Sequence, residues 1–120
     1  MARKNEPKTS TIRIPVREVE RAKRQHRLEL ISGPGAPRRI RLYGGSIVIG
    51  RSTTADVRIE TSELSRTHLS ITDVDGEFVA KDLDSRNGVY LNGVKIYSAT
   101  LKDGDQLQVG GVVIVYHEGD

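Results

Sequence analysis

Short hydrophobic runs, in which apolar and polar residues often alternate, recur along the chain from His26 onward. Such alternation is typical of a β-strand that has one face on a core and the other in water. Short strands at spacings of about 8–12 residues indicate a β-sandwich or a β-barrel. The runs that predict strands are 28–31, 40–43, 47–49, 57–59, 69–71, 78–80, 89–91, 94–96, 106–109 and 112–116.

Turn signals separate these runs with similar regularity. Asn-Gly and Asp-Gly pairs supply the positive φ angles of tight hairpins. No convincing long helix interrupts the series, so we predict an all-β sandwich of about eleven short, mainly antiparallel strands, with its ligand-binding loops at one end. The turn signals are Gly33-Pro34-Gly35, Gly44-Gly45, Asp75-Gly76, Asn87-Gly88, Asn92-Gly93, Asp103-Gly104 and Gly110-Gly111.

The first 25 residues differ from the rest in composition. They lack aromatic residues and are dense in charge, which leaves too little apolar surface to offset the entropy of ordering. The sequence therefore predicts a basic, flexible N-terminal tail over residues 1–25 and one folded domain over 26–118. Residues 1–28 carry nine Lys/Arg against three Glu, whereas the remainder carries ten against thirteen Asp/Glu. The high isoelectric point is thus a property of the tail.

Several function classes are excluded by composition. The chain has no cysteine, so neither a disulfide framework nor a thiolate metal site is available. No apolar run approaches the roughly 18 residues of a membrane helix, and the charged N-terminus lacks the apolar stretch of a signal peptide. We therefore expect a soluble, cytoplasmic protein that does not bind membranes, with secretion by another route left open.

Three polar clusters lie where hydrophobic runs end and turn residues begin: Gly50-Arg51-Ser52, Ser65-Arg66-Thr67-His68 and Ser85-Arg86-Asn87-Gly88. Loops at one end of a sandwich can converge on a single patch. Guanidinium and hydroxyl groups together make charge-assisted hydrogen bonds to a phosphate. An asparagine amide carries both a donor and an acceptor, which suits the main chain of an extended ligand. The combination predicts a binding module for a phosphorylated peptide.

Catalytic and metal-binding interpretations of these clusters fail on physical grounds. Gly45 and Gly50-Arg51-Ser52 almost spell a P-loop, but a P-loop leads into a helix and this segment follows a strand. Ser65 and His68 lack an orienting acid, so they are a weak candidate for nucleophilic catalysis. A calcium loop begun by Asp82 fails because Arg86 occupies the third ligand position. We expect no enzyme activity, no metal and no cofactor.

In order and spacing the clusters resemble the signature of the forkhead-associated (FHA) domain family, small single-domain type, over roughly residues 27–117. The signature comprises Gly-Arg, then Ser-x-x-His, then Asn-Gly. The resemblance implies a β-sandwich that reads phosphothreonine in preference to phosphoserine. It implies phosphate binding by Arg51, Ser65 and Arg66, peptide binding by Asn87, Arg86, Ser52 and Thr67, and structural support of the site by Gly50, His68 and Gly88.

The resemblance also implies partners. We expect a phosphothreonine-containing protein as ligand and a Ser/Thr protein kinase upstream. Some small bacterial members of the family are phosphorylated on their own N-terminal tail, which then occupies the pocket. Thr9 and Thr11 are the candidate phosphosites for such a switch here. The alternative is an unmodified solubilising arm that attracts nucleic acid weakly.

Two other functions stay open at this point. A scaffold or assembly component could use the same fold without phosphate, although the intact Arg51, Ser65 and Asn87 argue against it. Nucleic-acid binding through the tail would be weak and salt-sensitive, because few aromatic residues are present for base stacking. Met1 and the short segment after the last predicted strand favour a small protein of its own, and one module of a larger protein is the alternative.

Overall fold

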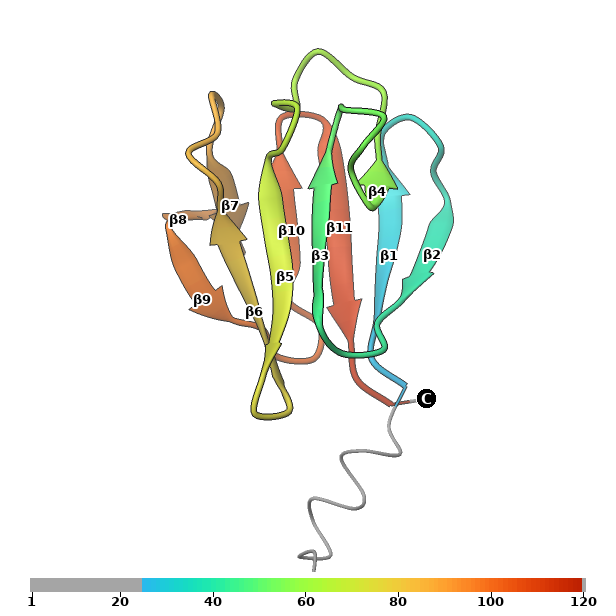
Figure 1. Ribbon diagram of the computed structural model, residues 1–120, viewed down its shortest axis with the longest axis vertical. Helices are drawn as coiled ribbons and strands as arrows, with labels where there is room; N and C mark the ends of the chain where they lie inside the picture. The colour runs from blue at the N-terminus through green and yellow to red at the C-terminus, as the bar shows by residue number, and fades with distance from the viewer. Residues whose placement is uncertain (1–24, 120) are drawn as a thin grey trace, which may run out of the picture.

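Two β-sheets pack face to face in the computed structural model, which describes residues 25–119 (Figure 1). The six-stranded sheet has the order β2 (Arg38–Arg41), β1 (Arg27–Ser32), β11 (Val112–His117), β10 (Gln106–Val109), β7 (Val89–Leu91) and β8 (Val94–Ile96). The five-stranded sheet has the order β4 (Val57–Arg58), β3 (Ser46–Gly50), β5 (Leu69–Val74), β6 (Glu77–Asp82) and β9 (Ser98–Thr100). The described residues contain no helix, and the predicted all-β sandwich is confirmed.

All ten hydrophobic runs contain or overlap a strand, and an eleventh strand had no such run. This strand, β9, has the sequence Ser98-Ala99-Thr100, in which a single small apolar residue gives no alternation. Pairing with β6 places Ala99 opposite Ala80, so β9 is defined by its partner and not by its own hydrophobicity. Strand pairing is antiparallel except between β3 and β4, which run parallel.

The core lies between the two sheets and follows the alternation along each strand. Val112, Ile114 and Tyr116 of β11 are at most 2% exposed, while the residues between them are half-buried. Leu28 and Leu30 of β1 repeat this pattern beside them. The buried positions of β3, β5 and β6 face them from the other sheet, and together these side chains form one continuous hydrophobic cluster.

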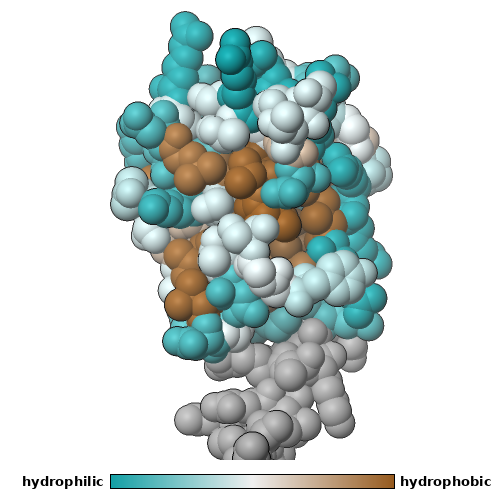
Figure 2. Space-filling model, in the orientation of Figure 1, coloured by the Kyte–Doolittle hydropathy of each residue, from teal (hydrophilic) through white to brown (hydrophobic). Residues whose placement is uncertain are grey.

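The loops with the polar clusters lie at one end of the sandwich (Figure 1), and hydrophilic side chains project from this end (Figure 2). The β3–β4, β4–β5 and β6–β7 connections and the β10–β11 turn all lie there, and the first and last described residues lie at the opposite end. The predicted tail up to residue 24, with Thr9 and Thr11, lies outside the described residues. Across residues 25–119 no helix is long and apolar enough to cross a membrane.

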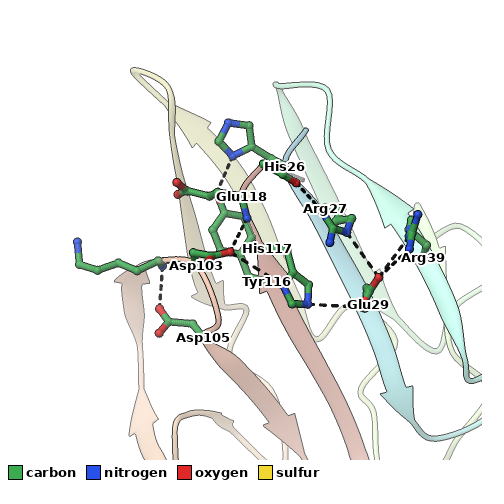
Figure 3. A network of polar contacts seen from close by, with 11 residues as sticks. His26, Arg27, Glu29, Arg39, Asp103, Asp105, Tyr116, His117 and Glu118 are labelled. Atoms are coloured by element: carbon green, nitrogen blue, oxygen red, sulfur yellow. Dashed lines mark hydrogen bonds and ion pairs between the residues drawn. The ribbon is translucent and has the colours of Figure 1, made fainter. Parts of the chain in front are cut away.

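A polar network joins the strands at the opposite end (Figure 3). His26 Nδ1 lies 2.8 Å from the hydroxyl of Tyr116, which donates to Glu118 Oε2 at 3.1 Å. Glu29 accepts contacts from Arg39 at 3.1 Å and from His117 at 3.4 Å. The network ties β1, β2 and β11 together where the described chain begins and ends, away from the loops with the polar clusters.

Candidate functional site

The first two clusters are joined by a pair of backbone hydrogen bonds. Arg51 N donates to the carbonyl oxygen of Ser65 at 3.0 Å, and Ser52 N donates to that of Arg66 at 3.1 Å. These bonds continue the pairing of β3 with β5 beyond the end of the sheet. The β3–β4 and β4–β5 loops therefore lie against each other, as the convergence of the clusters requires.

Gly50 allows this close approach. A Cβ added at Gly50 would overlap the carbonyl oxygen of Arg66 and lie 2.7 Å from its carbonyl carbon. Backbone atoms cannot move aside as the end of a flexible side chain can, so any larger residue would push the two loops apart. The structure thus gives Gly50 a steric role beneath the site.

His68 connects the second cluster to the third. Its ring is fully buried, and its Nδ1 accepts a hydrogen bond from Ser65 N at 2.9 Å. On the other side, Nε2 donates to the carbonyl oxygen of Gly88 at 2.8 Å, since a backbone carbonyl can only accept. The two partners fix the tautomer with the proton on Nε2. His68 therefore holds the β4–β5 and β6–β7 loops at a set separation and faces away from solvent.

The hydroxyl of Ser65 points to the third cluster. Ser65 Oγ accepts a hydrogen bond from Arg86 N at 3.0 Å. A serine hydroxyl has one proton to donate and two lone pairs, so its proton is available to a ligand oxygen. Ser65 is half-buried, which limits the desolvation that a ligand must offset.

Asn87 is bonded on one side of its amide. Its Nδ2 donates to the carbonyl oxygen of Glu63 at 2.7 Å, and no described residue bonds its Oδ1. The side chain is exposed at the loop end. Its free oxygen can accept a hydrogen bond from the main-chain N–H of an extended ligand.

Three arginines surround the resulting hollow. Arg51 Nε donates to the carbonyl oxygen of Leu64 at 3.1 Å, which leaves the two terminal nitrogens of the guanidinium for other partners. Arg66 and Arg86 are exposed and form no ion pair within the described part of the chain. The hollow has a volume of about 170 Å³, and its lining residues are Arg51, Ser62, Glu63, Leu64, Ser65, Arg66 and Arg86. Three guanidinium groups against one carboxylate make it a site for an anion.

Three of the four predicted peptide-binding residues, Asn87, Ser52 and Thr67, do not line this hollow, although Asn87 bonds its lining residue Glu63. Ser52 Oγ lies 2.8 Å from Thr54 Oγ1 and accepts from Thr54 N, so its hydroxyl caps its own turn. Thr67 is exposed on the β4–β5 loop. Their assignment to peptide binding stays a prediction.

Glu63 is a site residue that the sequence did not single out. Its carboxylate accepts a hydrogen bond from Gly111 N at 3.0 Å, while its carbonyl oxygen holds Asn87. Glu63 thus links the β4–β5 loop to the β6–β7 loop and to the β10–β11 turn. The polar run Thr61-Ser62-Glu63 signalled a loop, but not which loops it would join.

The described residues hold no group of three or more His, Cys, Asp or Glu that could bind a metal ion. The candidate site is instead one of arginines, hydroxyls and an amide. Such groups are complementary to negative charge and to main-chain hydrogen-bonding groups.

The chain is similar in sequence to several characterised bacterial proteins. The oxoglutarate dehydrogenase inhibitor of Corynebacterium diphtheriae is 33% identical over 87 residues, which are 72% of this chain and 61% of that protein. The glycogen accumulation regulator GarA of Mycolicibacterium smegmatis is 33% identical over 87 residues, 72% of this chain and 55% of that protein. The chain thus spans less than two thirds of the length of these relatives.

Solved structures and a family model agree with them. An FHA domain studied for phosphothreonine-dependent interactions superimposes with a TM-score of 0.71 at 31% identity, over 78% of this chain and 95% of that one. EmbR of Mycobacterium tuberculosis, in complex with a low affinity phosphopeptide, superimposes with a TM-score of 0.71 at 28% identity, over 78% of this chain and 24% of that one. The FHA domain model matches residues 47–110, a segment that contains all three clusters. The chain belongs to the FHA domain family.

Proposed function

We propose that this chain is a phosphothreonine-dependent peptide-binding module in Ser/Thr kinase signalling. The observation that carries the proposal is the hollow in which Arg51, Arg66 and Arg86 surround the hydroxyl of Ser65, with Asn87 beside it. A phosphate group has the charge and the acceptor oxygens that these donors require. Recognition of a phosphorylated segment by an arginine cluster is a recurring binding mode.

In this proposal each side chain of the site has its own role. The terminal nitrogens of Arg51 and the guanidinium of Arg66 would pair with phosphate oxygens, and the Ser65 hydroxyl would donate to a third. Asn87 Oδ1 would accept from the ligand main chain, because its Nδ2 already bonds the carbonyl oxygen of Glu63. Gly50 and His68 would contact the loops and not the ligand, since both are buried beneath them.

The relatives support this ligand class. One similar FHA domain has phosphothreonine-dependent interactions, another was solved with a phosphopeptide, and the FHA domain of FhaA was solved in complex with the intracellular domain of Rv3910. FHA domains are binding modules, so the proposal assigns no catalytic residue. We infer that the partner is a protein that a cytoplasmic Ser/Thr kinase phosphorylates on threonine. We also infer that residues 26–118 are the binding domain.

The decisive experiment is a titration of the chain with phosphothreonine peptides and their unphosphorylated counterparts. Arg51→Ala should weaken binding of the phosphorylated peptide by about 30-fold or more, because a charge-assisted hydrogen bond is worth about 2 kcal/mol or more. Arg41→Ala is the matched control, since Arg41 is an exposed arginine of β2 that lies opposite Arg27, at the end of the sandwich away from the site. Equal affinity of both peptides, or of wild type and Arg51→Ala, would refute the proposal and favour a phosphate-independent scaffold.

Regulation by the tail is part of the proposal. Phosphorylation of Thr9 or Thr11 would convert the tail into a ligand for the chain's own site, which would then exclude external partners. GarA and the oxoglutarate dehydrogenase inhibitor, two of the relatives, are named as regulators. The tail is joined to the domain at the end opposite the site, so the length of the intervening segment decides whether it can reach (Figure 1).

A further inference from the structure

A second hollow borders the phosphate site. It has a volume of about 420 Å³ and is lined by Arg51, Arg58, Glu60, Thr61, Ser62 and Arg86. Arg51, Ser62 and Arg86 line both hollows. A peptide with its phosphate in the first hollow would therefore place a neighbouring residue in or near the second.

The parallel pairing of β3 with β4 brings Arg58 to this position. Gly50 lies opposite Arg58 in the ladder, directly before Arg51. Arg58 Nε donates to the carbonyl oxygen of Arg51 at 3.1 Å, which ties its guanidinium to the phosphate loop. The carbonyl oxygen of Arg58 in turn accepts from Arg38 Nη1 at 3.2 Å. Arg58 is thus positioned by its backbone and by its side chain.

The guanidinium of Arg58 has N–H donors that no described residue accepts. One terminal nitrogen lies 2.9 Å from Glu60 Oε2, and both side chains are exposed, at 43% and 69%. Exposed ion pairs of this kind contribute little free energy, about 1 kcal/mol or less. Arginine has five N–H groups, so several of those on Arg58 stay available to a ligand.

Hydroxyls add neutral donors to the same wall. Thr61 Oγ1 accepts a hydrogen bond from Glu63 N at 3.2 Å, so its proton is free to donate. Ser62 is exposed beside it, and no described residue bonds its hydroxyl. Arg86, unpaired within the described residues, completes the wall toward the phosphate hollow.

The charge of the second hollow exceeds what one phosphate uses. The proposed function assigns Arg51 and Arg66 to the phosphate in the first hollow. Arg86 lines both hollows, and Arg58 lines only the second, where Glu60 is the one carboxylate of the lining. We propose that the second hollow is an anion subsite, in which Arg58 and Arg86 bind a second negative group of the same peptide, either a carboxylate or a second phosphate. This inference rests on the proposed function of the first hollow.

The subsite is tested with short synthetic peptides that carry one central phosphothreonine. Glutamate replaces glutamine at one flanking position at a time, and in a second series an added phosphothreonine replaces threonine. Wild type should bind the best glutamate peptide about 3–10-fold more tightly than its glutamine counterpart, and the best doubly phosphorylated peptide by about tenfold or more. The two series thus distinguish a carboxylate from a phosphate as the preferred group.

The role of Arg58 is isolated by a double-mutant cycle. Arg58→Gln should reduce the glutamate-to-glutamine ratio to about one, and Lys102→Gln, which removes a positive charge at the opposite end of the domain, should leave the ratio unchanged. A ratio of about one at every position and in both series for wild type, or a ratio that Arg58→Gln retains, would overturn the subsite. If no peptide requires its phosphothreonine for binding, the proposed function itself fails. That result differs from failure of the subsite, in which phosphothreonine peptides bind but the second negative group has no effect.

Discussion

His68 Nε2 lies 2.8 Å from the carbonyl oxygen of Gly88, a contact that joins the β4–β5 loop to the β6–β7 loop from inside the sandwich. His68, three residues after Ser65, thus determines where Asn87, next to Gly88, presents its amide. Ser65 N bonds the other nitrogen of the same ring at 2.9 Å. The loops that carry Ser65 and Asn87 are therefore held by one buried side chain.

Replacement of His68 by alanine should both destabilise the domain and weaken phosphopeptide binding. The change leaves Ser65 N and the Gly88 carbonyl without their partner and opens a cavity, so we expect a loss of about 2–4 kcal/mol in the free energy of unfolding. Thermal unfolding and peptide titration measure the two effects. His117→Ala, on the half-buried face of β11, is the control and should leave peptide affinity unchanged. Unaltered unfolding of His68→Ala would contradict the bracing role.

Replacement of Glu63 should weaken peptide binding and destabilise the domain by similar, modest amounts. Its carboxylate bonds Gly111 N, and its carbonyl oxygen holds Asn87, so Glu63→Ala releases the loop that positions the amide. We expect phosphopeptide affinity to fall by about 3–10-fold, with a change in the free energy of unfolding of about 1 kcal/mol. Glu63→Gln keeps an acceptor oxygen for Gly111 N and should restore most of the affinity. Equal affinities for Glu63→Ala and wild type would show that Gly111 and Glu63 do not position Asn87.

The sequence predicted the strands well where hydrophobic residues alternate, because a sheet with one buried face imposes that period. It missed β9, whose half-buried Ala99 lies opposite Ala80 through pairing with β6 and not through a hydrophobic pattern of its own. The convergence of the three clusters followed from the placement of loops at one end of a sandwich. The individual contacts between the clusters could not be predicted from the sequence, because they depend on how loops of irregular backbone pack against one another.

Arg58 shows where such prediction ends. Its run predicted a strand, and a strand residue gives no indication of a ligand. Parallel neighbours usually need a connection of a dozen or more residues, yet β3 and β4 are joined by residues 51–56 alone. Asp56 Oδ2 accepts from Val48 N at 2.8 Å and closes this short return. The parallel pairing that places Arg58 beside the phosphate loop was therefore not readable from the sequence.

Glu29 should make stability depend on acid pH. Burial raises the pKa of its carboxyl, but hydrogen bonds from Arg39 and Arg27 and the charge of His117 outweigh this and hold the pKa below its ordinary value of 4.5 (Figure 3). Because the folded-state pKa is lowered, the stabilisation is present above the unfolded-state pKa and is lost as pH falls through the folded-state value.

The comparison is between wild type and Glu29→Gln. The midpoint of thermal unfolding should differ between them above about pH 5 and converge as the pH is lowered through the acid range. Glu77→Gln, at an exposed position of β6, should give no pH-dependent difference from wild type. A difference between Glu29→Gln and wild type that grows toward acid pH would contradict the sign of this prediction.

Regulation by the tail requires that a phosphorylated Thr9 or Thr11 can reach the site, and that its effective concentration there is high enough to fill it. About 16 residues separate Thr9 from Gln25, the first described residue. Treated as a random coil, such a segment has an end-to-end distance of about 20–24 Å and can extend to about 50 Å. A six-residue strand such as β1 (Arg27–Ser32) spans about 20 Å, so a phosphorylated tail can pass from one end of the sandwich to the other.

A tethered ligand acts at an effective concentration of about millimolar, so a modest intrinsic affinity suffices to fill the site. Phosphorylation of the chain at Thr9 or Thr11 should therefore reduce its affinity for an external phosphothreonine peptide by about tenfold or more. Deletion of residues 1–24, or the matching Thr9→Ala or Thr11→Ala change, should abolish this reduction. Arg51→Ala separates occupation of the pocket from an indirect effect, because it should weaken binding of the phosphorylated tail as it weakens binding of a free phosphothreonine peptide. If free peptides phosphorylated at Thr9 or Thr11 do not compete with the external peptide even at millimolar concentration, the tail is an arm and not a switch.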